Sequence, residues 1–156
     1  MSNLRYHNSQ RLRQRKNIRK ARGNRLEQNR YLIEQYPWLC PYLDDNGKIP
    51  NNYDYNGTLL DALPSGWKDL VLDLCAELKV LLDKYNLVDK YRVAEAKEKW
   101  FMLRWYDYLT DGSEMPQDIV DLVIRYEEQS QHVCMLCGDN KDSTKPCCIS
   151  CMAIYY

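Results

Sequence analysis

The chain has 156 residues, which is enough for one domain with a hydrophobic core and an appendage. Hydrophobic residues make up 45% of it and charged residues 28%, as in an ordinary globular protein. It contains no apolar run near the ~18–20 residues that cross a membrane, and no apolar signal-peptide segment follows its start. We therefore expect a cytoplasmic protein that binds no membrane.

The formal net charge is zero, but the charges are divided unequally along the chain. Residues 1–30 carry ten Lys and Arg and a single acidic residue, a net charge of +9. The other 126 residues carry 12 Lys and Arg and 21 Asp and Glu, a net charge of −9. A basic arm on an acidic body is typical of proteins that bind nucleic acid or an acidic partner.

Residues 1–35 are expected to form this Arg-rich arm, either helical or disordered. Leu12, Ile18 and Leu26 are too sparse for a continuous apolar stripe, so a helix there would be marginal alone in water. The main interpretation is an arm that neutralises RNA or DNA phosphates. Docking on an acidic protein surface, a solvated tail and a transit peptide are the alternatives. The predicted phosphate contacts are Arg11, Arg13, Arg15, Lys16, Arg19, Lys20, Arg22 and Arg25.

Residues 36–131 are predicted to form an α+β body. Pro37 ends any preceding helix, because the residue before a proline is disfavoured in the α region. After a connector rich in turn residues, Leu and Val recur at helical spacing and predict an amphipathic helix. We expect it to begin near Ser65, a candidate N-cap, and to stop near Asn86.

The next segment changes period. Alternating side chains between Tyr91 and Tyr108 predict a β-hairpin that turns near Lys99 to Met102, with a helix over the same residues as the alternative. Arg104 and Trp105 on this hairpin are weaker candidates for nucleic-acid contacts. A second amphipathic helix is expected to begin at Pro116 and to end about Gln131.

Two Cys-x-x-Cys pairs lie in the last segment, residues 132–156, and give the clearest chemical signal in the chain. Two such pairs facing each other form a closed tetrahedral site suited to structural Zn²⁺, which has no open position for catalysis. The predicted ligands are Cys134, Cys137, Cys148 and Cys151. Cys147 in place of Cys148, or His132 in place of a thiolate, is the alternative. The odd total of seven Cys argues against a disulfide scaffold.

Catalytic motifs are not found in the sequence. It has two His, and no Gly-rich phosphate loop, His-Glu-x-x-His motif or nucleophile elbow. We therefore expect neither an enzyme nor a small-molecule substrate.

Ten residues of the predicted hairpin carry a resemblance to a known family. The segment from Lys97 to Tyr106 reads Lys-Glu-Lys-Trp-Phe-Met-Leu-Arg-Trp-Tyr. It resembles the Lys-Glu-Lys-aromatic-Gly-x-Leu-Arg-aromatic-Tyr signature of an uncharacterised family of small zinc-knuckle proteins from bacteria, prophages and phages. The resemblance covers residues 36–151 and implies an accessory protein of a phage or mobile element, acting in the host cytoplasm. Phe101 stands where the family has its hairpin glycine, which puts a turn with positive φ in doubt and suggests a different turn or exposed aromatic side chains.

Together these features predict an α+β domain with two main amphipathic helices, a β-hairpin and a C-terminal four-Cys zinc knuckle pair, preceded by a basic arm. The function expected from them is non-enzymatic, zinc-stabilised binding associated with RNA or DNA. The alternative is a phage-encoded interaction module that inhibits or regulates a host nucleoprotein machine, such as a defence nuclease, through its arm or its acidic body.

Overall fold

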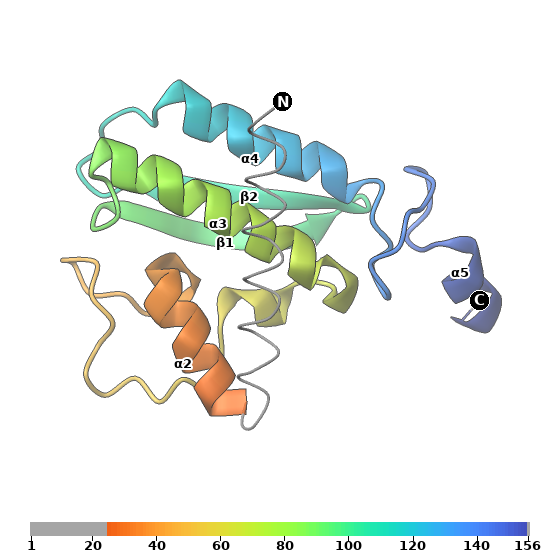
Figure 1. Ribbon diagram of the computed structural model, residues 1–156, viewed down its shortest axis with the longest axis horizontal. Coiled ribbons are helices and arrows are strands. Elements are labelled where there is room, and N and C mark those ends of the chain that lie inside the picture. The colour runs from red at the N-terminus through yellow and green to blue at the C-terminus, as the bar shows by residue number, and fades with distance from the viewer. Residues whose placement is uncertain (1–24, 156) are drawn as a thin grey trace.

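The computed structural model describes residues 25–155. In this part of the chain α3 and α4 lie side by side on one face of a two-stranded antiparallel sheet, α2 lies below them, and α5 lies at the far end (Figure 1). The elements are α2 (Arg25–Gln35), η1 (Pro37–Leu39), η2 (Leu59–Ala62), η3 (Ser65–Trp67), α3 (Lys68–Tyr85), β1 (Tyr91–Lys99), β2 (Met102–Leu109), α4 (Gln117–Ser130) and α5 (Ile149–Tyr155). The predicted α+β class is confirmed.

The hairpin prediction is confirmed and the alternative helix is wrong. Strands β1 and β2 pair in antiparallel register from Tyr91 with Leu109 to Lys99 with Met102, which leaves a two-residue turn. Trp100 and Phe101 in this turn have φ of 56° and 62°. The positive-φ turn that Phe101 put in doubt is therefore present, because the twist of paired strands favours a type I′ turn, in which both central residues have positive φ. For residues other than glycine this conformation costs roughly 1–2 kcal/mol each.

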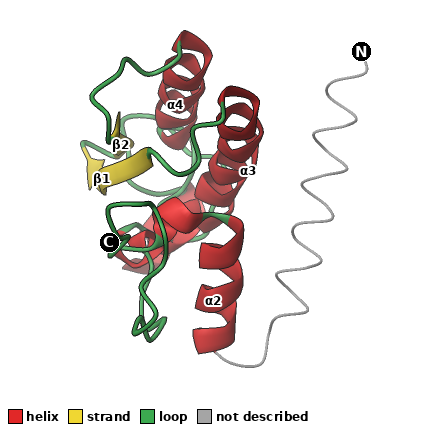
Figure 2. Ribbon diagram, turned by 90° about the vertical axis from the view of Figure 1, so that its left-hand side faces the viewer, coloured by secondary structure: helices red, strands yellow, loops and turns green. Residues whose placement is uncertain are grey.

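One edge of the sheet is covered by α4. The backbone N–H of Leu103 donates to Ser130 Oγ at 2.7 Å, and that of Trp105 donates to Glu127 Oε1 at 2.8 Å. These N–H groups face away from β1, and an exposed row of them would invite pairing with another chain. Seen from the side in Figure 2, both α3 and α4 lie on the same side of the hairpin.

Helix α3 supplies the largest share of the core. Its buried side chains are Val71, Leu72, Leu74, Cys75, Leu78 and Leu82. Asn86 ends the helix in the left-handed conformation, with φ of 53°, as predicted. The predicted N-cap is wrong, because η3 occupies Ser65–Trp67 and α3 begins only at Lys68, with no side-chain cap.

A buried polar network lies beside α3. Trp105 is only 3% exposed, and its Nε1 donates to Tyr91 Oη at 2.9 Å. Tyr91 in turn donates to Asp107 Oδ2 at 2.7 Å, and burial raises the pKa of Tyr91. Trp105 is therefore a core residue, and the suggestion that it contacts nucleic acid is wrong.

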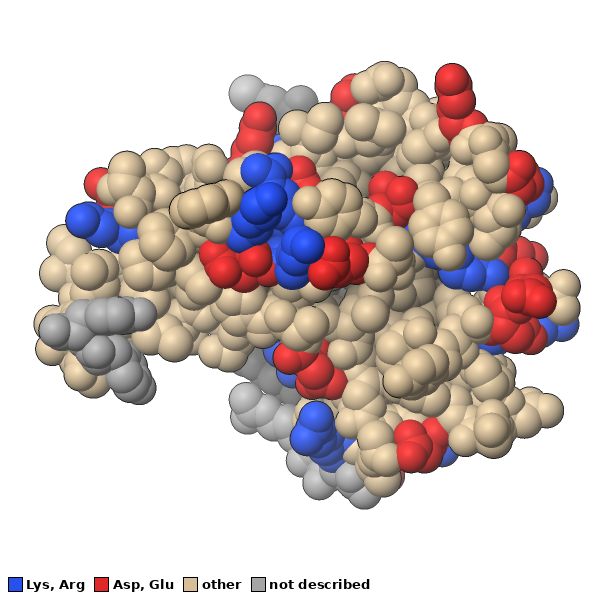
Figure 3. Space-filling view, turned by 180° about the vertical axis from the view of Figure 1, so that it is seen from behind, with Lys and Arg blue, Asp and Glu red and all other residues tan. Residues whose placement is uncertain are grey.

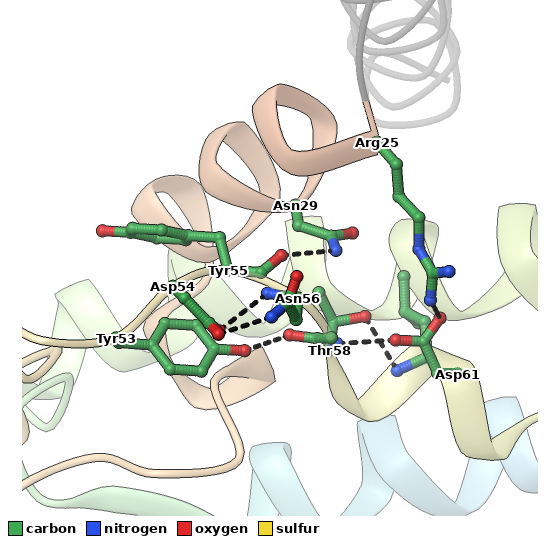
Figure 4. Close-up of polar contacts among 10 residues, drawn as sticks. Arg25, Asn29, Tyr53, Asp54, Tyr55, Asn56, Thr58 and Asp61 are labelled. Carbon is green, nitrogen blue, oxygen red and sulfur yellow. Dashed lines mark hydrogen bonds and ion pairs between the residues drawn. The ribbon is translucent and has the colours of Figure 1, made fainter.

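Helix α2 belongs to residues 1–35, the segment predicted as the basic arm, but it packs into the core. Its Leu32 and Ile33 are buried in the same hydrophobic cluster as the core side chains of α3. Asn29 Nδ2 donates to the Tyr55 carbonyl at 2.8 Å, and Arg25 lies 3.6 Å from Asp61 in an ion pair (Figure 4). Arg30 lies over the Tyr55 ring, 4.4 Å from its centroid. Residues 25–35 are thus held against the body by both apolar and polar contacts.

None of the helices among residues 25–155 combines the length and the apolar character needed to cross a membrane.

Candidate metal centre

Four thiols gather at the C-terminal end of the described chain. The Sγ atoms of Cys134, Cys137, Cys148 and Cys151 all lie within 4.8 Å of one another. A tetrahedral zinc with Zn–S bonds of ~2.3 Å separates its sulfurs by about 3.8 Å. The Cys137 and Cys148 sulfurs are 3.6 Å apart, close to that spacing, and no disulfide joins any of the seven Cys. The donor set therefore fits a four-thiolate metal site.

The first pair is positioned by a tight backbone turn. The N–H of Cys134 donates to the Asp139 carbonyl at 2.7 Å, and the N–H of Gly138 donates to the Cys134 carbonyl at 3.0 Å. Gly138 has φ of 84°, a conformation that side chains other than glycine rarely adopt. The turn lets the Asp139 N–H donate to Cys137 Sγ at 3.5 Å, so the backbone also supplies a hydrogen bond to a thiolate.

The electrostatics of the turn favour a thiolate at Cys134. Burial alone raises the pKa of this thiol, but hydrogen bonds from the backbone N–H groups of Cys137, Cys148 and Leu136 outweigh burial and lower the pKa to about 6. This lowering favours the thiolate at Cys134, the form in which cysteine binds a metal.

The second pair lies at the start of α5. The N–H of Met152 donates to the Cys148 carbonyl at 3.0 Å, as in a helical turn. Residues three apart lie on the same face of such a turn, so Cys148 and Cys151 both face the first pair. The N–H of Met135 donates to the Pro146 carbonyl at 3.1 Å and joins the two halves of the site.

The two alternative ligands are not part of this cluster. Cys147 is buried next to it, and its thiol pKa is raised by burial and by the charge of Cys134. His132 supplies backbone only, since its carbonyl accepts from the Lys141 N–H at 3.0 Å. Among the described residues, the four that the Cys-x-x-Cys spacing predicted are the ones brought together.

Sequence reasoning missed a buried lysine beside the thiols. Lys141 is only 8% exposed, and its Nζ donates to the carbonyls of Gln131 and Asp142. Burial lowers its pKa, while the charges of Cys134 and Cys147 act in the opposite direction. A buried ammonium at this position would offset part of the negative charge that four thiolates bring to a metal ion. Lys141 lies in a polar loop, where no helical or strand periodicity in the sequence marks a residue as buried.

The surface that holds the site was also missed. The N–H of Gly66 donates to the Met135 carbonyl at 2.9 Å, and Ser65 Oγ donates to the Leu136 carbonyl at 3.2 Å. Trp67 Nε1 donates to the Val133 carbonyl at 3.0 Å. A Cβ on Gly66 would lie 2.1 Å from the Cys134 carbonyl oxygen, so only glycine permits this close approach. Ser65 and its neighbours therefore anchor the metal site and do not cap α3.

Of the predicted phosphate contacts, only Arg25 belongs to the described residues, at the first position of α2. Arg11, Arg13, Arg15, Lys16, Arg19, Lys20 and Arg22 lie outside them. On the hairpin, Arg104 lies 3.6 Å from Glu127.

Comparisons with protein-family models, with curated proteins and with solved structures find no match to this chain.

Proposed function

We propose that this is a non-enzymatic, zinc-stabilised binding protein whose basic arm contacts the phosphates of RNA or DNA. The observation that carries the proposal is the separation of charge. Residues 1–24 hold eight Lys and Arg and no acidic residue, whereas all 22 Asp and Glu belong to the rest of the chain. Lys and Arg gathered in one segment neutralise phosphates and release counterions, and this release supplies most of the free energy of non-specific nucleic-acid binding.

The metal in this proposal is zinc, held by Cys134, Cys137, Cys148 and Cys151. Four thiolates suit Zn²⁺ and occupy all four of its positions, so the ion would stabilise the fold and not act on a substrate. The closed donor set supports a binding protein over a metalloenzyme.

The attachment of α2 supports a fixed starting point for the arm. Arg25 and Arg30 already contact the body, through Asp61 and Tyr55. An arm that starts from a packed helix loses less freedom on binding than one on a flexible linker. We therefore assign phosphate binding mainly to the seven basic residues from Arg11 to Arg22.

The experiment is a salt titration of full-length protein with a short RNA and a short DNA of equal length. About seven phosphate contacts give a slope of log affinity against log salt of roughly −5 to −6. Replacing Arg11, Arg13, Arg15, Lys16, Arg19, Lys20 and Arg22 by Gln should remove most of the affinity and flatten the slope. The control replaces four exposed body lysines, Lys48, Lys68, Lys84 and Lys90, by Gln. An equal loss in both variants, or a flat slope for the unchanged protein, would contradict the proposal.

A second candidate is an interaction module that inhibits or regulates a host nucleoprotein machine. The acidic body favours it, because residues outside 1–24 carry 14 Lys and Arg against 22 Asp and Glu. Helix α5 also exposes Ile149 and Ile154, at 90% and 74%. Under this candidate, one host complex stays bound to the tagged full-length chain after nuclease treatment, and the salt titration above shows no direct nucleic-acid binding.

A further inference from the structure

Trp100 is the one exposed tryptophan of the four in the chain. It is 80% exposed, whereas Trp38, Trp67 and Trp105 are each exposed by 3% or less. It lies at the tip of the β1–β2 hairpin, beside Phe101, which is 37% exposed. Packing in the core therefore accounts for three of the tryptophans and does not account for Trp100.

The turn itself also gives no reason for an indole at this position. A two-residue hairpin turn with positive φ favours Asn and Gly, which adopt that conformation with little strain. Here it holds two bulky aromatic residues at φ of 56° and 62°. The N–H of Phe101 donates to Glu98 Oε1 at 2.7 Å, which helps to hold the tip in this strained form. Backbone strain of this kind concentrates at functional sites, where the side chain presented is what matters.

The charge around the tip differs from that of the body. Residues 97–104 contain Lys97, Lys99 and Arg104 against Glu98, a net charge of +2. The other described residues carry 11 Lys and Arg against 21 Asp and Glu, a net charge of −10. Lys97 lies 2.8 Å from the Glu95 carboxylate and Arg104 lies 3.6 Å from that of Glu127, so each of these charges is partly neutralised. Lys99, next to Trp100 in the sequence, is therefore the cation with most of its charge available.

The same strands expose further aromatic rings. Tyr106 and Tyr108 are 45% and 50% exposed, and Lys97 Nζ lies 5.4 Å from the centroid of the Tyr106 ring. Figure 3, which shows the molecule from behind, has a group of basic side chains near the middle of the face with acidic ones on either side. Aromatic rings interleaved with cations are the combination that binds single-stranded nucleic acid, since every unpaired base offers a π face.

We propose that Trp100 stacks on an unpaired base of a single-stranded nucleic acid bound by this protein. This proposal rests on the proposed function. The bases of a duplex are already stacked on one another, so the contact gives a preference for single strands over duplexes that the arm's charge alone does not give. The local positive charge favours a nucleic acid over a protein pocket as the occupant of this tip.

The test uses the full-length protein with a 15-nucleotide oligo(U), the matching oligo(dT), and a 15-base-pair duplex at one salt concentration. Because the other tryptophans are buried, the emission that iodide quenches in the free protein belongs to Trp100. Adding either single strand should quench that emission and protect it from iodide, whereas the duplex should do neither.

Two variants make the test independent of folding. Trp100→Gly removes the ring and relieves the strained φ, so the turn is expected to remain intact. It should weaken single-strand affinity by about 5- to 150-fold and leave duplex affinity unchanged. Trp100→Tyr should restore most of the single-strand affinity. Ile149→Ala, which removes another exposed apolar side chain, is the matched control and should change neither affinity.

The outcomes separate this inference from the proposed function. If Trp100→Gly binds single strands as tightly as the unchanged protein, stacking is refuted while the arm's role stands. Equal losses on single strand and duplex also refute it, because they show no contact special to unpaired bases. If the unchanged protein binds no nucleic acid at all, the proposed function fails and this inference with it. Loss of a nuclease-resistant protein partner on Trp100→Gly would then place the tip in a protein pocket.

Discussion

The body (residues 25–131) and the C-terminal metal module (residues 132–155) are stabilised by different interactions. The body buries large apolar side chains from α2, α3, the hairpin and α4 in one continuous cluster. In the module, the buried residues that cluster are Cys134, Cys147 and Cys148, while Leu136, Ile149 and Ile154 are 42%, 90% and 74% exposed. Apolar burial is the main driving force in folding a domain, and a segment with so little of it needs another source of stability. We propose that thiolate–metal bonds supply to the module the stability that buried Leu and Trp supply to the body.

The largest effect is expected from removing one thiolate. Structural zinc contributes about 10–16 kcal/mol in small zinc domains at neutral pH. Cys134→Ser should therefore abolish zinc binding and unfold the module, while the helices and hairpin of the body persist. Metal analysis and circular dichroism measure the two effects. Cys75→Ala is the control, since Cys75 is fully buried in α3 and its loss should weaken the body with zinc retained. One zinc per chain in Cys134→Ser would refute the assignment.

A cavity in the body tests the comparison from the other side. Leu78 is fully buried on α3, so Leu78→Ala should lower the free energy of unfolding by about 2–5 kcal/mol. Denaturant unfolding followed by far-ultraviolet circular dichroism measures this loss. Zinc affinity, measured by competition with a chelator in native buffer, should stay the same. A large fall in zinc affinity would mean that the two regions do not have separate sources of stability.

Disrupting the contact between the body and the module is expected to have an intermediate effect on stability. A Cβ on Gly66 meets the Cys134 carbonyl oxygen at 2.1 Å and the Gly138 nitrogen at 2.8 Å. Gly66→Ala should cost about 1–3 kcal/mol and weaken zinc binding, because the first Cys pair has to move away from η3. Gly57→Ala is the matched control, since its Cβ meets only the flexible Asp61 carboxylate at 3.2 Å. Unchanged zinc affinity in Gly66→Ala would show that the module does not depend on this surface.

The smallest effect should be a gain in stability at the hairpin tip. Replacing Trp100 by Asn and Phe101 by Gly gives the turn the residues that favour positive φ. The double variant should gain about 1 kcal/mol, a rise in melting temperature of roughly 2–6 °C for a domain of this size. Calorimetry with zinc present measures it. A lower melting temperature would show that the two aromatic side chains stabilise the body.

The sequence anticipated the features that depend on local spacing. The apolar stripe of α3, the stop at Asn86 and the two Cys-x-x-Cys pairs all follow from residues a few positions apart. What it missed depends on residues far apart in the chain, such as the bond between Trp67 and Val133, 66 positions away. The role of Ser65 was misjudged for this reason, because a serine before an amphipathic stretch has the same sequence pattern whether it caps the helix or contacts another segment.

The hairpin turn shows a different limit. Residues other than glycine rarely adopt positive φ, so the sequence at positions 100 and 101 put the turn that the structure shows in doubt. The register of the two strands leaves only two residues for the turn, and this tertiary requirement overrides the preference of Trp100 and Phe101. The backbone strain at Trp100 and Phe101 is the reason for assigning a role to the exposed indole.

Hydrogen exchange of the full-length protein, with zinc and after treatment with a chelator, tests the central contrast most directly. Removing zinc should expose the amides of residues 132–155 to rapid exchange, while α3, β1 and β2 keep their protection. Adding zinc back should restore slow exchange in the same peptides. Protection that is unchanged by the chelator, or lost equally across the body and the module, would contradict the account of a metal-held module on an independently packed body.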